Sequence, residues 1–371
     1  MDLKFEDFNG KYNTLNGIKT MDINRLELCR HIMQVGYNNR RNFIGASWYK
    51  HLQLFFMVCA NVKEENGKLV LKDDYFDLDQ SEKVCVSYQL GQGLTKAVAE
   101  EYLKIPWVTH FKTMKTMGCT FNVGGKKKKI IDSNENSGSE PDLVGYDKNG
   151  AIHLLESKGS SRNTTTDKII QKAINQVSNI VDITNSKVRS NFSTRSACIF
   201  NFKDNFHGRI IDPPVDGNEI NEKKYFGLMQ CLYDYYYDFF YEYNNGKIET
   251  INILDRKWEG CYFSFGNEQY FWGIDLSFRK FLMDQIFGNP DLIEKIISKP
   301  KPSKPSKPSK PSKPEQSSES EECEGYYDAD KAKKILDFFN KTEILDFCEK
   351  KDMDRDPNTS VGLDFFMLHR I

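Results

Sequence analysis

The chain has 371 residues, with 52 Lys and Arg against 53 Asp and Glu, and a formal net charge of -1. This length allows two or three domains of ordinary size. The balance of charge excludes a general attraction to nucleic acid or membrane, so such a partner must be met by a local patch. The 26 Phe and 18 Tyr residues predict packed structure for most of the chain.

The nine cysteines are scattered and form no CxxC pair. This favours reduced thiols in a cytosolic protein over disulfides or a zinc site. The first residues lack an apolar segment behind a basic start, so no signal peptide is expected. The longest apolar run, near Leu54 to Val62, is too short to span a bilayer. The sequence therefore predicts a cytoplasmic protein without a membrane partner.

Residues 1–85 are expected to form a helical N-terminal region, because Ile23, Leu26, Ile32 and Met33 recur at helical spacing. Residues 86–215 are expected to form an α/β core with a mixed central sheet flanked by helices, because short strands alternate with helical segments. The helices are expected at 94–103 and 166–181, and the strands at 118–123, 142–146, 151–158 and 197–202.

Residues 216–298 are expected to form an α+β extension packed on this core. A helix after Lys224 carries an aromatic stripe, for which core packing is favoured over base stacking. Asp234, Asp238 and Glu242 are four residues apart and are expected to form its solvated face. Strands are expected at 262–265 and 270–276.

Residues 299–324 are a linker, first rich in Lys, Pro and Ser and then acidic. Proline and like charges favour an extended spacer of roughly 50 Å for its Lys/Pro/Ser repeat. A basic arm on DNA phosphates is the alternative interpretation. Residues 325–371 are expected to form a small helical tail, from Ile335, Phe338, Phe339 and Leu345 at helical spacing.

The stretch from 138 to 161 carries the chemistry. Asn149-Gly150 is a strong hairpin signal, so the flanking apolar segments are expected to be paired antiparallel strands. Asp142 opens the first strand, and Glu156 and Lys158 share one face at the end of the second. Because the far ends of a hairpin lie side by side, all three groups are expected at one end of the sheet.

Two crowded carboxylates are destabilising unless a cation lies between them, and Mg²⁺ prefers oxygen ligands. The ammonium of Lys158 would then lie beside the ion, where it could hold an attacking water or offset the charge of a phosphate. The alternative is a surface hairpin with an incidental Glu-Lys pair.

This stretch resembles the PD-(D/E)xK nuclease superfamily, through Pro141-Asp142 and Glu156-Ser157-Lys158. The resemblance covers roughly residues 90 to 210 and implies a restriction-endonuclease-like core. It implies that Asp142 and Glu156 bind Mg²⁺ or Mn²⁺ with the carbonyl of Ser157, and that Lys158 is catalytic. The bare pattern also occurs elsewhere, as in Glu222-Lys223-Lys224, but not at the end of an apolar run after a hairpin turn.

Similar enzymes carry a Gln or Lys on the helix after this strand, which makes Gln176 a candidate for orienting water or phosphate. The alternative for Gln176 is a place at the margin of the apolar face. Similar enzymes also supply an extra acid from the preceding helix, and Glu101 is the choice here for a further metal ligand. Lys126, Lys127, Lys128 and Lys129 are a candidate contact to nucleic-acid phosphates or a solvated loop.

These observations predict a Mg²⁺-dependent endonuclease that hydrolyses phosphodiester bonds of DNA. By analogy alone, it would be a restriction or phage-defence effector. The alternatives are a nuclease acting on RNA and a non-catalytic module that binds nucleic acid or protein. The C-terminal tail is a candidate contact for a homodimer or a partner protein.

Overall fold

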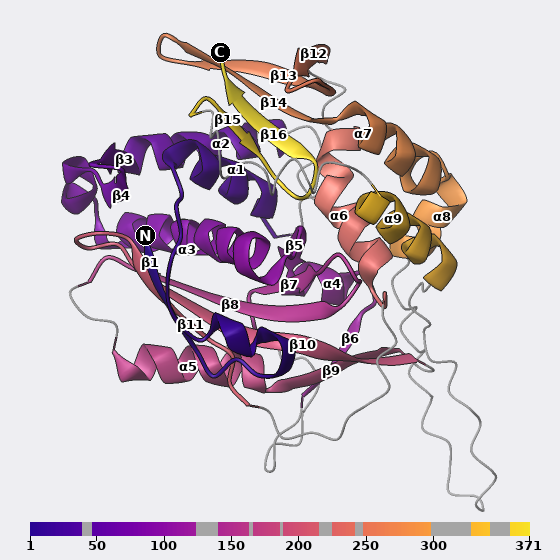
Figure 1. Cartoon of the computed structure of the whole chain (residues 1–371), viewed down its shortest axis with the longest axis horizontal. Coiled ribbons are helices and arrows are strands. Elements are labelled where there is room, and N and C mark those ends of the chain that lie inside the picture. Colours follow the sequence, from indigo (N-terminus) through magenta and orange to yellow (C-terminus); the bar gives the residue numbers. More distant parts are fainter. Residues whose placement is uncertain are drawn as a thin grey trace, which may run out of the picture.

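The computed structural model of the chain describes residues 1–38, 47–123, 140–162, 166–185, 188–214, 225–241, 248–297, 328–341 and 357–371 (Figure 1). A mixed nine-stranded sheet lies at its centre, and its main path has the order β2-β1-β11-β10-β8-β7-β5. β8 is parallel to β10 and β1 is parallel to β11, whereas the other neighbours on this path are antiparallel. The strands of the path are β1 (Asp2–Glu6), β2 (Gly17–Thr20), β5 (Trp107–His110), β7 (Leu143–Tyr146), β8 (Ile152–Ser160), β10 (Val188–Asn201) and β11 (His207–Ile211).

Two further strands extend the sheet beside the start of β10. β6 (Thr120–Val123) pairs with β9 (Ile180–Asn185), and β9 pairs with β10. Helices lie on both sides of the sheet (Figure 1). The expected α/β architecture with a mixed central sheet flanked by helices is therefore confirmed.

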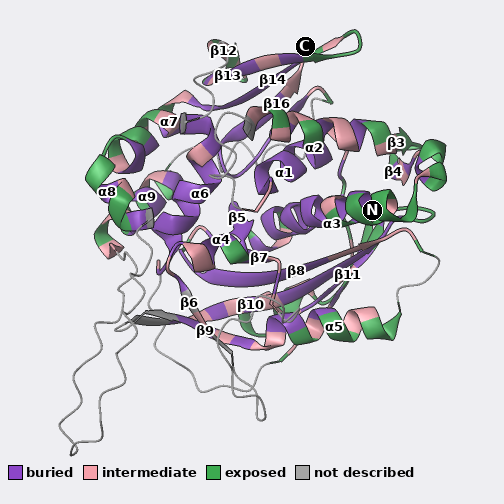
Figure 2. Ribbon diagram, turned by 180° about the vertical axis from the view of Figure 1, so that it is seen from behind, coloured by how far each residue is buried: buried purple, intermediate pink, exposed green. Residues whose placement is uncertain are grey.

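The two helices that matter most for the site cover opposite faces of β8 and β10. α3 (Gln80–Leu103) lies so close to β8 that a Cβ on Gly159 would overlap the carbonyl oxygen of Ser87. α5 (Asp167–Ser178) packs its Ala173 and Val177 on Ala197 and Ile199 of β10. Figure 2 shows the second half of α3 buried, whereas the first turns of α3 and the outer face of α5 are exposed.

The N-terminal region is more than the helical segment that the sequence predicts, because β1 and β2 join the central sheet. Leu3 and Phe5 alternate with polar residues, and both are buried against the core. α3 also crosses the expected boundary between the N-terminal region and the core at residue 86, since it begins at Gln80. The remaining elements before β5 are η1 (Gly10–Leu15), α1 (Arg25–Val35), α2 (Ser47–Asn61), the hairpin of β3 (Val62–Glu65) and β4 (Lys68–Leu71), and η3 (Asp73–Asp77).

A second sheet, of order β12-β13-β14-β16-β15, is antiparallel and joins residues from both sides of the expected linker. The expected helical tail is present as α9 (Ala329–Lys341), but the tail also supplies β15 (Thr359–Val361) and β16 (Phe366–Arg370). The linker itself and Leu345 lie outside the described residues. The other elements are α4 (Phe111–Thr116), α6 (Leu228–Tyr241), β12 (Glu249–Ile253), β13 (Arg256–Phe265), β14 (Glu268–Asp275), α7 (Leu276–Leu282), η5 (Met283–Phe287) and α8 (Pro290–Ile297).

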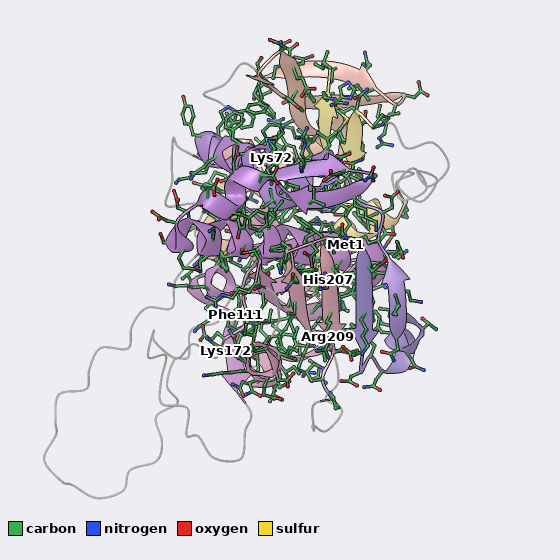
Figure 3. The ribbon with its side chains drawn as sticks, turned by 90° about the vertical axis from the view of Figure 1, so that its left-hand side faces the viewer. Met1, Lys72, Phe111, Lys172, His207 and Arg209 are labelled. Atoms are coloured by element: carbon green, nitrogen blue, oxygen red, sulfur yellow. The ribbon has the colours of Figure 1, made fainter. Side chains whose placement is uncertain are left out.

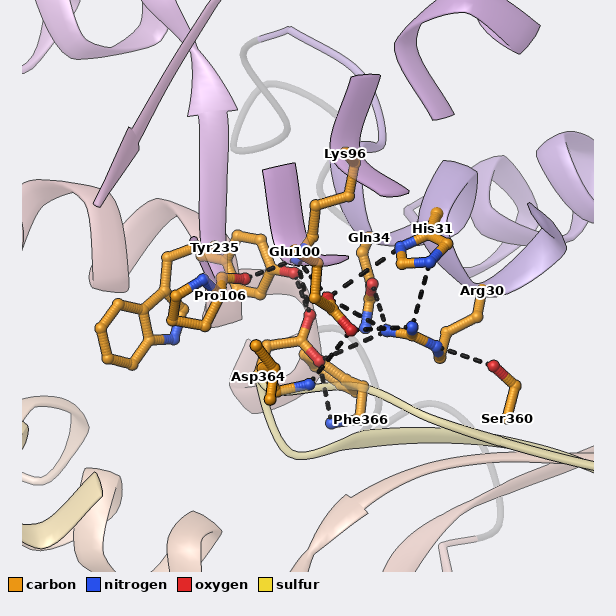
Figure 4. Close-up of polar contacts among 12 residues, drawn as sticks. Arg30, His31, Gln34, Lys96, Glu100, Pro106, Tyr235, Ser360, Asp364 and Phe366 are labelled. Atoms are coloured by element: carbon orange, nitrogen blue, oxygen red, sulfur yellow. Dashed lines mark hydrogen bonds and ion pairs between the residues drawn. The ribbon is translucent and has the colours of Figure 1, made fainter. Parts of the chain in front are cut away.

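A buried charge network attaches this tail to α1 and α3 (Figure 4). Arg30 donates to Glu100 at 2.9 Å and to the Ser360 hydroxyl at 2.9 Å. Lys96 donates to Glu100 at 2.7 Å, and its Nζ lies 3.5 Å from Asp364 Oδ2. The tail is therefore part of the folded body.

The aromatic residues of α6 pack in the core, as favoured from the sequence; Tyr235 and Tyr236, for example, are almost wholly buried. The expected solvated face of this helix is wrong for two of its acids. Asp234 and Asp238 are buried. The cost of burying them is offset because Asp234 accepts a hydrogen bond from Thr109 and Asp238 accepts one from His51. Glu242 lies outside the described residues. Among the described residues, no helix is long and apolar enough to cross a membrane.

Candidate active site

The hairpin of β7 and β8 brings Asp142 and Glu156 together. Leu143 is paired with Leu155, so Asp142 lies just before this last pair and Glu156 just after it. The backbone N–H of Asp142 donates to Glu156 Oε2 at 3.0 Å, and the N–H of Ser157 donates to Asp142 Oδ2 at 3.1 Å. Glu156 is thus held by the backbone of Asp142, and Asp142 is held by the backbone of the residue that follows Glu156.

Lys158 completes the cluster on the same face of β8. Glu156 is paired with Ala197 and Lys158 with Ile199, two β10 residues that pack under α5, so both charged side chains leave the sheet on the α5 side. Lys158 Nζ makes an ion pair with Glu156 Oε1. Its side chain is 26% exposed and that of Glu156 is 0% exposed, so the ammonium links a buried carboxylate to solvent.

The electrostatics of the pair favour a bound cation. Burial and the neighbouring carboxylate of Asp142 raise the pKa of Glu156 to about 8, although Lys158 opposes the shift. Burial also raises the pKa of Asp142, against the effect of Lys158 and the Ser157 N–H. The single positive charge of Lys158 therefore does not fully offset the negative charges of Asp142 and Glu156, whereas the two positive charges of a divalent ion would.

The donor set fits a hard ion with few protein ligands. Within the described part of the chain, no group of three or more His, Cys, Asp or Glu side chains is placed to hold a metal. Mg²⁺ commonly takes one or two carboxylates and completes its shell with water and substrate phosphate. Asp142 and Glu156 would hold such an ion, with the carbonyl of Ser157 as the ligand that the resemblance implies.

Gln176 of α5 lies beside the segment that precedes β7. Its Nε2 donates to the carbonyl oxygen of Glu140 at 2.7 Å, two residues before Asp142. The side chain is buried, and its Oε1 accepts no hydrogen bond from the described residues. Gln176 thus fixes the segment that carries Asp142.

The structure does not bring Glu101 to this cluster. Residues Ser87 and Gly91 of α3 lie against β8, and Glu101 is ten residues further along, about 15 Å along the helix axis. Glu101 is exposed, whereas its neighbour Glu100 points inward to Arg30 and Lys96. The extra acid expected from this helix is therefore not Glu101. Lys126, Lys127, Lys128 and Lys129 lie outside the described residues.

Two residues of α3 that the sequence interpretation missed belong to this neighbourhood. Desolvation of the hydroxyl and the charges of Asp142 and Glu156 raise the pKa of Tyr88, although the residue as a whole is 45% exposed. This hydroxyl accepts a hydrogen bond from Gln92 at 2.6 Å. No pattern in their own segment signals this position, because the carboxylates belong to other elements. Gly91 lets the helix approach, since a Cβ there would lie 3.0 Å from both the Gly159 nitrogen and the Ser157 hydroxyl.

Comparisons of the chain with protein-family models, with curated proteins and with solved structures find no match. The functional class of the protein therefore rests on its α/β fold and on the geometry of this cluster.

Proposed function

We propose that the protein is a metal-dependent endonuclease that hydrolyses phosphodiester bonds of DNA, with a restriction-endonuclease-like core. The observation that supports this function is the reciprocal bonding of Asp142 and Glu156 beside Lys158 at one end of β7 and β8. Two carboxylates and a partly exposed ammonium, held by strands, are suited to phosphodiester hydrolysis.

Each residue has a distinct role in this proposal. Asp142 and Glu156 hold the Mg²⁺ or Mn²⁺ ion, which when bound supplies positive charge and Lewis acidity at the phosphate. Lys158 holds the attacking water and offsets negative charge on the phosphate. The water oxygen bonds to phosphorus, the bond to one ester oxygen breaks, and a proton lost by the water is gained by that leaving oxygen, which gives a phosphate monoester and a hydroxyl. Gln176 keeps Asp142 in place through Glu140.

The proposal is tested by incubating plasmid, in its duplex and in its single-stranded form, with purified protein and Mg²⁺ or Mn²⁺, with and without chelator. Wild type should cut in a chelator-sensitive way, and Asp142→Ala and Lys158→Ala should lose about 100-fold or more of the rate. Glu101→Gln and Lys68→Ala, at exposed positions away from the cluster, are the matched controls and should cut as wild type does.

Other outcomes would select other functions. If wild type and both variants retard DNA in a gel and none cuts it, the protein is a binding module and the endonuclease proposal fails. If only an RNA substrate in parallel tubes is cut, the same cluster acts on RNA. A role in restriction or phage defence would require that the intact protein, and not Lys158→Ala, protects cells from phage.

A further inference from the structure

A pocket of about 370 Å³ opens beside Lys158, between the first half of α3 and the start of α5. Its floor is the end of β8 and the two residues after it, from Ser157 to Arg162, together with Ile199 and Phe200 of β10. Its walls carry Lys83 and Tyr88 on one side and Lys172 on the other; Figure 3 shows Lys172 at the molecular surface. This volume suits one small ligand or one unit of a polymer.

The charge around the pocket has a single sign. Lys83, Lys158, Arg162 and Lys172 line it, and no Asp or Glu is among the described residues that do so. Lys172 is exposed and has no acidic partner in the described part of the chain. Such a rim favours an anion, and a phosphodiester strand is an anion of repeated charge.

The wall on α3 includes a pair of exposed side chains with apolar surface. Val84 and Tyr88 are one helical turn apart and are 56% and 45% exposed. An exposed aromatic ring beside lysines is the combination on which bases of single-stranded nucleic acid stack. The basic rim of the pocket therefore suits the phosphate of a nucleotide, and the exposed side chains of Val84 and Tyr88 suit its base.

An unsatisfied hydroxyl gives independent support for a ligand. Ser157 lines the pocket and is only 2% exposed, yet its Oγ makes no hydrogen bond with any described residue. A buried hydroxyl without a partner is uncommon in folded proteins. This hydroxyl lies toward Gly91 of α3, so the α3 side of the pocket floor holds a polar atom that lacks a partner among the described residues.

We propose that this pocket binds one unpaired nucleotide of the substrate strand next to the scissile phosphate, so that the enzyme acts on single-stranded or locally unpaired DNA. This inference rests on the proposed nuclease function. A base can enter a pocket between two helices only after it has left the duplex stack. Lys158 lines the pocket and makes an ion pair with Glu156, which places the nucleotide beside the cluster.

Binding of fluorescent oligonucleotides to the full chain, in chelator, tests the pocket without cleavage. Wild type should bind an oligothymidine strand more tightly than a blunt duplex of the same length. Lys172→Glu, Val84→Glu and Tyr88→Ala should each weaken single-strand binding about tenfold or more. Lys68→Glu, the matched control on β4, should not. Val84 and Lys172 are exposed, so their variants are expected to fold, which thermal unfolding checks.

Cleavage with Mg²⁺ or Mn²⁺ then separates the two proposals. Wild type should cut a single strand and a duplex with an unpaired bubble, but not a blunt duplex. The pocket is refuted, and the nuclease stands, if blunt duplex is cut as fast as single strand and the pocket variants match Lys68→Glu. The nuclease is refuted, and the pocket stands, if nothing is cut while the pocket variants still lose single-strand binding.

Discussion

Gly159 of β8 lies so close beneath Ser87 of α3 that a side chain at position 159 would overlap the Ser87 carbonyl oxygen. Gly159→Ala should therefore lower the free energy of unfolding, by about 1–3 kcal/mol, because α3 must move away from β8. Gly91→Ala, where a Cβ meets its neighbours at 3.0 Å, should have a smaller effect. Denaturant unfolding of both variants checks this order, and equal stability of Gly159→Ala and wild type would contradict the close packing.

The raised pKa of Glu156 predicts a pH-dependent stability in chelator. Folding raises this pKa to about 8 from its ordinary value near 4.5, so the folded protein binds an extra proton between these pH values. Stability should fall as pH rises through this window, by at most about 1.4 kcal/mol per pH unit from this group. Glu156→Gln removes the titration, so the melting temperature of wild type relative to this variant should decline from pH 5 to pH 8.

A divalent ion should reverse this decline, because it binds the ionised carboxylates. Mg²⁺ or Mn²⁺ should raise the melting temperature of wild type most at pH 8, and should not raise that of Asp142→Asn by as much. Asp73→Asn changes an exposed carboxylate elsewhere and is the control. A pH-independent difference between wild type and Glu156→Gln would show that the Glu156 proton is not what couples stability to pH.

The network around Asp364 should be sensitive to the loss of one member. Asp364→Ala removes the acceptor for Tyr235 and leaves Glu100 to balance the charges of both Arg30 and Lys96. Breaking a buried ionic network of this kind costs about 3–5 kcal/mol of stability. Asp337→Ala on the exposed side of α9 is the matched control. Urea unfolding measures both, and similar midpoints would exclude a stabilising role for the network.

Gln176→Ala should weaken catalysis more than stability. It removes the bond to the Glu140 carbonyl, which costs about 1 kcal/mol of stability, and it loosens the segment that carries Asp142. We expect the cleavage rate to drop about tenfold with a higher concentration of Mn²⁺ needed for half-maximal rate. Gln171→Ala, on the outer side of α5, should leave both quantities unchanged.

Local signals in the sequence were sufficient for the hairpin and for the α/β architecture. Asn149-Gly150 and the alternation along β8 predicted the antiparallel pairing that places Asp142 beside Glu156. β1 was missed, although Leu3 and Phe5 alternate, because its partner β11 lies about 200 residues later and no local pattern reveals that pairing. The same reason applies to β16, which depends on β14.

Charged residues were the harder part of the prediction. Asp234 and Asp238 have the spacing of a solvated face, but Thr109 and His51 from other elements supply partners that make their burial favourable. The sequence favours Glu101 as the acid directed toward the site. In the structure its neighbour Glu100 is the inward one, because Arg30 and Lys96 converge on it only in the folded chain. Tyr88 was missed because nothing in its own segment indicates the carboxylates nearby.

The strand pair of residues 359–370 closes over helices made from the first hundred residues. During synthesis, Arg30, Lys96 and Glu100 leave the ribosome long before Ser360 and Asp364 can join them. The nascent chain therefore carries an incomplete set of buried charges until translation has passed the tail.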